Sequence, residues 1–300
     1  MMTSMRIRIT GTTKLLGVIG HPVSHSLSPV MHNAAIAHLG VDYVYLPLPV
    51  APEDLPQAIA GFAAIGLRGF NVTLPHKQAV MPFLNHISEI AQAVGAVNTI
   101  WRTDTGWAGT NTDVEGFLSP LLTLPPERSP DWSQSAAVIL GNGGSARAVV
   151  AGCAQLGLAQ IHVVGRDLDK LKAFQQSWRN SPIAALSVHL WEDLPKLLPR
   201  ATLLVNTTPI GMHPHTQASP LGAEPGLTMK SGMKSGAIAY DLIYTPNPTR
   251  FLQQATALGA MPISGLEMLV QQGAAALRLW LGQEVPVEVM RQALIEQLRG

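Results

Sequence analysis

The sequence predicts an α/β protein with two domains, the first of which is discontinuous along the chain. Apolar strand-like runs alternate with helical patterns, which is typical of mostly parallel sheets covered by helices. A polar, Pro-rich stretch at residues 124–130 interrupts this alternation as a linker would. The 300 residues are enough for two domains, because single cores stop growing at about 250–300 residues.

Each series of strands defines one domain. The first series is predicted at residues 15–19, 43–48, 67–72 and 97–101. We place the domain boundary between Glu115 and Gln134, so that the first domain covers residues 1–120 and the second begins at 134. The second series is predicted at residues 137–140, 161–164, 203–205 and 237–242.

Two amphipathic helices follow the last of these strands, at about residues 265–281 and 286–298. Because no strand lies beyond them, they cannot extend a sheet, and packing on the first domain would bury their apolar faces. Residues 263–300 are therefore expected to complete the first domain, which leaves 134–262 as the second. The long unpatterned segment 213–236 is expected to be a mobile loop beside a cofactor site.

A glycine-rich turn follows the apolar strand that begins the second domain. Glycines between a strand and a helix let the backbone approach a pyrophosphate, whose charge is stabilised at the helix N-terminus. The pattern predicts a Rossmann-type dinucleotide-binding domain. Its turn consists of Gly141, Asn142, Gly143, Gly144 and Ser145.

The next strand ends in Gly165-Arg166-Asp167, where a residue that reads the adenosine ribose is expected. A guanidinium at Arg166, with Lys170 nearby, favours a 2′-phosphate and therefore NADP. Asp167 has two interpretations. It either caps the following helix, which we favour, or accepts hydrogen bonds from the ribose hydroxyls of NAD.

A lysine follows another strand of the first domain. Pro75 cannot continue the ladder after residues 69–72, so Lys77 should lie at the carboxyl end of a strand, where open α/β sheets bind small molecules. An ammonium there can protonate a carbonyl oxygen during ketone reduction.

Ser26 and Ser28 precede Pro29 at a helix start, so they either bind a small carboxylate or cap the helix.

These motifs together resemble the shikimate dehydrogenase family, which includes shikimate/quinate dehydrogenases. Further matching blocks lie at residues 95–99, 109–113, 206–212, 240–244 and 265–273, in the family's order and along most of the chain. The resemblance implies a cytoplasmic, NADP-dependent enzyme that reduces 3-dehydroshikimate reversibly to shikimate, on the route to chorismate and the aromatic amino acids. The residues 165–167 depart from the family's usual Asn-Arg-Thr.

The resemblance also implies the roles of individual residues. Lys77 transfers the proton, and Asp113 lies close to it as its catalytic partner. Gln272 is preferred to Gln271 because it directly precedes Gly273. The implied substrate-binding residues are Ser26, Ser28, Thr73, Asn98, Asp113, Tyr244 and Gln272. The expected cofactor-binding residues are Gly141, Asn142, Gly143, Gly144, Ser145, Gly165, Arg166, Asp167, Lys170, Asn206, Thr207, Leu242, Gly265 and Met268.

Composition narrows the remaining choices. A formal net charge of +1 without long runs of like charge argues against nucleic acid or an anionic membrane as partner. The single cysteine, Cys153, indicates a reducing compartment, and its place in a predicted helix indicates a buried thiol. His213 and His215 lack a surrounding cluster of ligands, so no metal is predicted.

Alternative functions stay open at this point. An NAD-using quinate or dual quinate/shikimate dehydrogenase is the nearest, with Asp167 as its hint. A non-catalytic dinucleotide-binding protein would be expected to lack Lys77 or Asp113. A methylenetetrahydrofolate-dehydrogenase-like enzyme would not need the paired serines. A homodimer is compatible with all of these.

Overall fold

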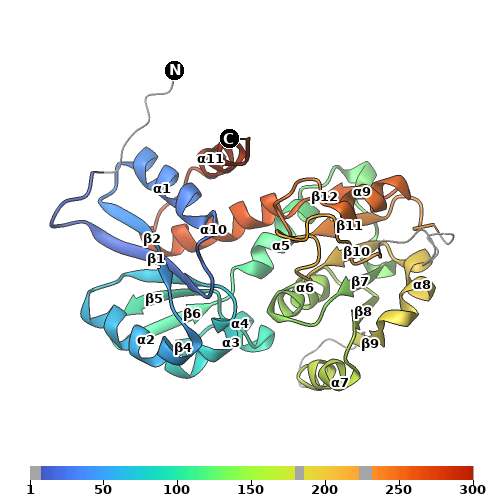
Figure 1. Ribbon diagram of the computed structural model, residues 1–300, viewed down its shortest axis with the longest axis horizontal. Helices are drawn as coiled ribbons and strands as arrows, with labels where there is room; N and C mark the ends of the chain where they lie inside the picture. The colour runs from blue at the N-terminus through green and yellow to red at the C-terminus, as the bar shows by residue number, and fades with distance from the viewer. Residues whose placement is uncertain (1–7, 180–185, 223–231, 300) are drawn as a thin grey trace. The chain divides into compact units, whose positions relative to one another are not determined.

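The computed structural model describes residues 8–179, 186–222 and 232–299, and it divides into two compact units. One unit runs to Gly116 and is completed from Leu269 onward, and the other spans Phe117–Met268 (Figure 1). Each has a six-stranded sheet with helices, as the predicted two-domain α/β class requires. Part of the predicted loop at 213–236 lies outside the described residues.

The sheet of the first unit is mixed, in the order β2-β1-β3-β5-β6-β4. β1 pairs in parallel with β2 and β3, whereas β5 is antiparallel to both β3 and β6. The predicted mostly parallel arrangement therefore holds only for part of this sheet. The strands are β1 (Lys14–Gly20), β2 (Tyr43–Pro49), β3 (Gly69–Val72), β4 (His86–Ile87), β5 (Thr99–Thr103) and β6 (Gly106–Thr110).

The sequence pattern did not predict β4 or β6. β4 has only two residues, and β6 contains two glycines, which lower its intrinsic preference for a strand. What defines β6 is its pairing with β5, from Thr99 opposite Thr110 to Thr103 opposite Gly106. This pairing is a tertiary feature that local composition does not reveal.

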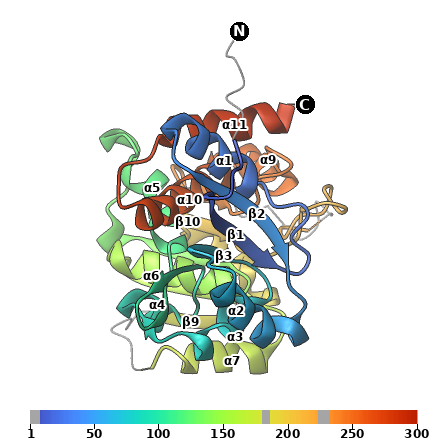
Figure 2. The ribbon, with the colours of Figure 1, turned by 90° about the vertical axis from the view of Figure 1, so that its left-hand side faces the viewer.

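The C-terminal helices of the chain occur as the pattern predicts. Trp280 of α10 donates from Nε1 to the carbonyl oxygen of Ile100 at 2.9 Å, and α11 packs on α1 (Figure 2). The elements of this part are α1 (Ser28–Leu39), α2 (Leu55–Ala64), α3 (His76–Ala79), α4 (Glu89–Val94), α10 (Gly265–Leu281) and α11 (Val287–Arg299), with short 3-10 turns at Pro52–Asp54 and Met81–Phe83.

The sheet of the second unit is parallel throughout, in the order β12-β11-β10-β7-β8-β9. Its strands are β7 (Ala136–Leu140), β8 (Gln160–Gly165), β9 (Leu186–Leu190), β10 (Leu203–Asn206), β11 (Ile238–Asp241) and β12 (Met261–Ile263). The edge strands β9 and β12 were not predicted, because they are short and only half-buried.

The helices of the second unit complete its βα layers. Cys153 of α6 is fully buried, as its place in an apolar helix suggested. The helices are α5 (Asp113–Leu122), which begins in the first unit, α6 (Gly144–Gln155), α7 (Leu168–Gln176), α8 (Leu194–Leu197) and α9 (Arg250–Ala257). Short 3-10 turns lie at Pro126–Arg128, Trp132–Gln134, Trp191–Asp193 and Leu198–Arg200. Among the described residues, no helix is both long and apolar enough to cross a bilayer.

We predict that Gly69→Ala destabilises the first unit. A methyl group at this position in β3 would lie 2.2 Å from Trp280 Nε1 and 2.8 Å from the carbonyl oxygen of Ile100. Such overpacking costs about 1–3 kcal/mol. Thermal unfolding followed by circular dichroism measures the effect. Gly61→Ala in α2, where a methyl group meets no atom within 4 Å, is the matched control and should be neutral or stabilising. Equal melting temperatures for the two variants would contradict the packing argument.

Candidate active site

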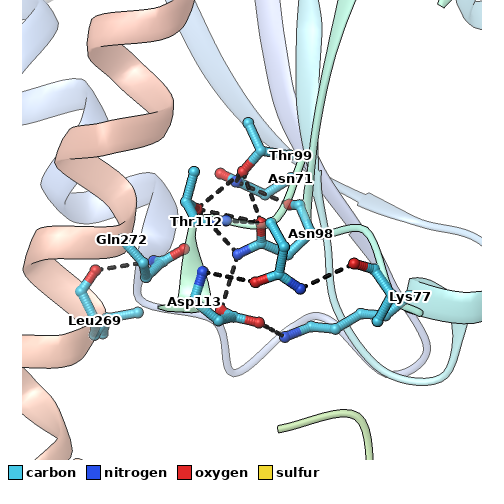
Figure 3. A network of polar contacts seen from close by, with 10 residues as sticks. Asn71, Lys77, Asn98, Thr99, Thr112, Asp113, Leu269 and Gln272 are labelled. Carbon is cyan, nitrogen blue, oxygen red and sulfur yellow. Dashed lines mark hydrogen bonds and ion pairs between the residues drawn. The ribbon is translucent and has the colours of Figure 1, made fainter. Parts of the chain in front are cut away.

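Lys77 and Asp113 form an ion pair at the end of β3. Lys77 Nζ lies 2.5 Å from Asp113 Oδ2, and the two side chains are only 14% and 9% exposed (Figure 3). The chain leaves β3 at Val72, turns, and enters the short helix α3. The Lys77 carbonyl oxygen accepts a hydrogen bond from the amide of Val97 at 2.8 Å. The predicted pair is therefore brought together from segments that are 36 residues apart.

The carboxylate of Asp113 is held from several directions. Asn98 Nδ2 donates to Asp113 Oδ1 at 2.8 Å, while Oδ2 receives the lysine. Asn111 Oδ1 accepts from the Asp113 amide at 3.0 Å, and Asn111 Nδ2 donates to the carbonyl of Ala96 at 2.9 Å. Asp113 also begins α5, where the helix dipole favours a negative charge. These contacts fix one orientation of the carboxylate beside the ammonium.

Asn98 belongs to a wider buried network (Figure 3). Its Oδ1 accepts from the Thr112 amide at 2.8 Å and from the Thr99 hydroxyl at 3.0 Å. Asn71 Nδ2 donates to Thr99 Oγ1 at 3.0 Å and to the Asn98 carbonyl at 3.1 Å. The sequence reasoning did not single out the side chains of Asn71, Thr99 and Thr112. Thr99 and Thr112 lie inside matching blocks and Asn71 inside a predicted strand, but only the strand pairing shows that the three converge.

Ser26 and Ser28 lie at the start of α1, with Pro29 in its first turn. The residue at the cap position is Leu27, and it makes no side-chain capping hydrogen bond. Ser28 is the first helical residue and is buried, and its amide donates to Ser26 Oγ at 3.3 Å. The helix-capping interpretation of Ser28 is therefore wrong, and α1 ends at Gly40, with φ +64°, as the sequence suggests.

His76 and His32 are both buried close to the predicted site residues. His76 Nε2 lies 2.8 Å from the Val50 carbonyl oxygen, which indicates a structural role for this ring. His32 Nδ1 lies 2.8 Å from the Ser28 carbonyl, and its ring stacks on Tyr45 at 4.1 Å between ring centroids. Burial lowers the pKa of His32 to about 4, so this imidazole is neutral near pH 7.

Thr73 and Gln272 complete the predicted residues of this unit. Thr73 is half-buried, and its amide donates to the Ile19 carbonyl at 2.9 Å. Gln272 Nε2 donates to the Leu269 carbonyl at 2.9 Å (Figure 3). This bond uses one of the two hydrogens on the amide nitrogen. Gly273 lets α10 approach α1, because a methyl group there would lie 2.3 Å from the end of Met31.

In the second unit, the glycine-rich turn has a backbone that a ligand can approach closely. Gly141 has a φ of +103°, and a methyl group on it would lie 2.8 Å from Thr207 Oγ1. At Gly143 a methyl group would meet nothing within 4 Å, so this backbone is open. No side chain caps α6 where it begins at Gly144, and Ser145 follows in its first turn. The first amide groups of α6 are therefore suited to an anion.

Arg166 and Asp167, at the end of β8, have different contacts and therefore different roles. Asp167 Oδ1 accepts from the amides of Asp169 and Lys170 at 3.0 and 3.1 Å, so it caps α7 as we favoured. The hydrogen bond from the Lys170 amide lowers the pKa of the Asp167 carboxyl group. Lys170 Nζ lies 3.5 Å from Asp167 Oδ2 and is exposed. Gly165, which precedes them, packs against Leu171.

Arg166 is exposed and lines a pocket of about 310 Å³. The pocket is largely apolar, with Trp191, Leu198 and Leu221 among its lining residues. A guanidinium beside an apolar pocket of this size suits a flat ring that bears a nearby anionic group. In the described part of the chain, no group of three or more His, Cys, Asp or Glu could hold a metal ion.

Asn206 is fully buried, and its amide is used inside the unit. Its Nδ2 donates to Asp241 Oδ1 at 3.0 Å, and its Oδ1 accepts from the Thr208 amide at 3.0 Å. Thr207 Oγ1 donates to the Leu140 carbonyl at 2.7 Å. Asn206 therefore orients the segment after β10, which agrees with a structural role more than with the predicted contact to a cofactor.

The other predicted residues of this unit lie after β11. The Leu242 amide donates to the Asn206 carbonyl at 3.1 Å, and a methyl group on Gly265 would lie 2.3 Å from the Leu242 carbonyl oxygen. Tyr244 is half-buried, and Met268 is buried. The close approach at Gly265 explains why a glycine stands there.

We predict that Asp241 makes folding stability fall as the pH rises from about 4 to about 6. Burial raises the pKa of Asp241 to about 6, despite opposing hydrogen bonds from Thr249, Ile243 and Asn206. An unfolded aspartate titrates near 3.9, so within this window the folded state holds a proton that the unfolded state has lost. Asp241→Asn removes this titration, and its stability should improve relative to the unaltered protein as the pH rises through the window.

Urea unfolding at several pH values between 4 and 7 measures this difference. Asp104→Asn, in an exposed turn, is the matched control and should follow the unaltered protein. Parallel profiles for the unaltered protein and Asp241→Asn would contradict the assignment.

Comparisons with known proteins agree with this geometry. Residues 18–100 match the family model of the shikimate dehydrogenase substrate binding domain, and residues 265–295 match that of the shikimate 5'-dehydrogenase C-terminal domain. The shikimate dehydrogenase (NADP(+)) of Nostoc sp. (strain PCC 7120) is 64% identical over 292 residues, which cover 97% of this chain and 99% of that protein.

Two solved structures share the whole fold. The structure of shikimate 5-dehydrogenase from Thermus thermophilus with NADP(H) and shikimate has a TM-score of 0.80 and 34% identity, and the match covers 95% of this chain and 99% of that one. The structure of the Listeria monocytogenes enzyme with shikimate and NAD has a TM-score of 0.85 and 32% identity, covering 97% and 100%. The chain matches a shikimate dehydrogenase at 64% identity over nearly its full length, and its paired lysine and aspartate and its glycine-rich turn fit that match. The chain therefore belongs to the shikimate dehydrogenase family.

Proposed function

We propose that this protein catalyses the reversible NADPH-dependent reduction of 3-dehydroshikimate to shikimate, on the route to chorismate and the aromatic amino acids. The observation that carries the proposal is the Lys77–Asp113 pair, which presents one ammonium beside a strand end within a network of fixed polar groups. Relatives that match nearly the whole chain are named as NADP(+)-dependent shikimate dehydrogenases, which supports the same reaction.

Lys77 is the proton donor in this proposal. NADPH, when bound, would supply the hydride for the ring carbonyl carbon, and the carbonyl oxygen would need one proton to become a hydroxyl group. The Lys77 ammonium gives that proton, and in shikimate oxidation the neutral amine accepts it. Asp113 holds the ammonium in one place through the 2.5 Å contact and accepts from a substrate hydroxyl group.

Substrate recognition follows from the remaining polar side chains. The Ser26 and Ser28 hydroxyl groups bind the substrate carboxylate beside the N-terminus of α1, and Tyr244 contributes a further hydroxyl group. Thr73, Asn98 and Gln272 bind ring hydroxyl groups. No side chain caps α1, so the Ser28 hydroxyl group is not used for capping, and this supports its part in the assignment.

NADP is the cofactor that the second unit suits better. The glycine-rich turn, from Gly141 to Ser145, would bind the pyrophosphate. Arg166 would bind the 2′-phosphate, and the apolar pocket that it lines would take the adenine ring. The capping of α7 by Asp167 supports this choice, because a carboxylate that accepts two amide hydrogen bonds is less available to ribose hydroxyl groups. Asn206, Thr207, Leu242, Gly265 and Met268 would shape the nicotinamide end.

The NAD-using quinate alternative has one observation in its favour, which is the carboxylate at Asp167. The bound NAD of the Listeria structure belongs to a relative at 32% identity.

A cytoplasmic location is part of our proposal and is supported by the single, buried cysteine. A homodimer stays a prediction, and light scattering on the purified protein tests it.

We predict that Lys77→Met lowers kcat for shikimate oxidation by roughly 10²- to 10⁴-fold, the usual effect of losing a general acid or base. The affinity for shikimate should change much less. Steady-state kinetics measure both, and Lys196→Met, which removes an exposed ion pair with Asp193, is the matched control. A folded Lys77→Met protein with nearly normal turnover would refute the assignment.

We predict that Arg166→Ala raises KM for NADP by roughly 10-fold or more, equivalent to about 1.4 kcal/mol, and leaves the kinetics with NAD nearly unchanged. Arg128→Ala, in an exposed 3-10 turn of the same unit, serves as the control. Equal losses with both cofactors, or a preference for NAD in the unaltered protein, would favour the NAD-using alternative.

A further inference from the structure

Tyr45 of β2 is a fully buried residue that lies next to the candidate substrate site. Its ring stacks on His32 with an interplanar angle of 9° and meets Trp280 at 6.0 Å between ring centroids. Its hydroxyl group lies 2.7 Å from Asn71 Oδ1, and the Ser28 side chain lies beside it. Burial raises the pKa of Tyr45 well above its ordinary value, so the phenol keeps its hydrogen.

The direction of the Tyr45–Asn71 hydrogen bond is fixed by its surroundings. Asn71 Nδ2 lies 3.1 Å from the backbone carbonyl oxygen of Asn98, which can only accept. The amide nitrogen of Asn71 must therefore face that carbonyl, and its oxygen must face Tyr45. Because Asn71 Oδ1 carries no hydrogen, the Tyr45 hydroxyl group is the donor.

The hydrogen bonds continue from Asn71 toward the ion pair. Thr99 Oγ1 accepts a hydrogen from Asn71, so its own hydrogen is available to Asn98 Oδ1 at 3.0 Å. Asn98 Oδ1 also accepts from the Thr112 amide, which turns Asn98 Nδ2 toward Asp113 Oδ1 at 2.8 Å. Every donor in the series Tyr45, Asn71, Thr99 and Asn98 thus points one way, toward the carboxylate of Asp113. Chains of aligned hydrogen bonds polarise one another in a buried setting.

We propose that Tyr45 is a positioning residue for the reaction, which acts through Asn71, Thr99 and Asn98 to hold the Asp113 carboxylate beside Lys77. This inference rests on the proposed function, because it needs Asp113 to serve the catalytic lysine. The inference depends on the single direction in which the hydrogen bonds run from Tyr45 to Asp113. Without the Tyr45 hydrogen, Asn71 Oδ1 is a buried acceptor without its donor, and nothing from β2 holds the amide in this orientation.

Tyr45→Phe tests the proposal, because it removes one oxygen atom and keeps the ring stacked on His32. We expect kcat to fall roughly 3- to 10-fold, the effect of losing one neutral hydrogen bond, with KM for shikimate changed less than about 2-fold. Thr99→Val interrupts the series of hydrogen bonds at its middle and should lower kcat to a similar extent. Tyr43→Phe is the matched control. Tyr43 lies two residues earlier in the same strand, and its ring packs against Lys14.

A double-mutant cycle separates this inference from the proposed function. In an Asp113→Asn background, Tyr45→Phe should cause no further loss of kcat, because both changes act on the same carboxylate. If Asp113→Asn lowers kcat but Tyr45→Phe and Thr99→Val do not, or if the losses multiply, the inference fails and the proposed function stands. If only KM changes, the phenol acts on Ser28 and the inference also fails. If Asp113→Asn leaves kcat unchanged, the role proposed for Asp113 is wrong and the inference fails with it, while the proposed reaction itself stands. Melting temperatures confirm that the variants are folded.

Discussion

The structure of the first unit depends on keeping an ammonium and a carboxylate 2.5 Å apart in a nearly buried site. Removing charges from water is costly, and the mutual attraction of a pair offsets the cost only when further hydrogen bonds satisfy the remaining atoms. Asp113 has that support from Asn98 and from the N-terminus of α5. The polar groups around the pair are therefore a condition for its existence.

The mixed sheet supplies these groups because of its antiparallel strands. Pairing of β5 with β3 places Asn98 and Thr99 next to Asn71, and pairing of β5 with β6 delivers the segment from Asn111 to Asp113 to the same end. A wholly parallel sheet would send consecutive strands through long crossover connections. The antiparallel strands β5 and β6 need only a short turn, so the residues that hold the carboxylate come from one compact part of the chain.

Much of the fold was predictable because strong local signals carried it. β1, β7 and β8 are largely buried apolar runs bounded by turns, and the glycine-rich turn before α6 follows from the need for a positive φ at Gly141. The edge strands β4, β9 and β12 were missed, since short and half-exposed strands have little pattern of their own. β6 was missed because its two glycines hide a strand that only pairing with β5 stabilises.

The candidate site was predictable in its charged residues and less so in its supporting ones. Lys77 stood out through the proline that ends its strand, and Asp113 through the resemblance of its motif. Tyr45 gave no such signal, because a buried tyrosine is an ordinary core residue until its partners are known. Thr99 lies inside a matching block, but nothing in the sequence shows that its hydroxyl group joins Asn71 to Asn98. Asn206 shows the opposite case, in which a residue of a matching motif turns its amide inward to Asp241.

The central claim is that Lys77 and Asp113 serve one substrate hydroxyl group while the paired serines hold the carboxylate. A crystal structure of the protein with both shikimate and NADP+ tests this most directly. We expect the shikimate carboxylate to lie within hydrogen-bonding distance of the Ser26 and Ser28 hydroxyl groups, and the hydroxyl group to be oxidised to lie within hydrogen-bonding distance of Lys77 Nζ. Shikimate bound with its carboxylate at Lys77, or with its reactive hydroxyl group away from the Lys77–Asp113 pair, would contradict the account.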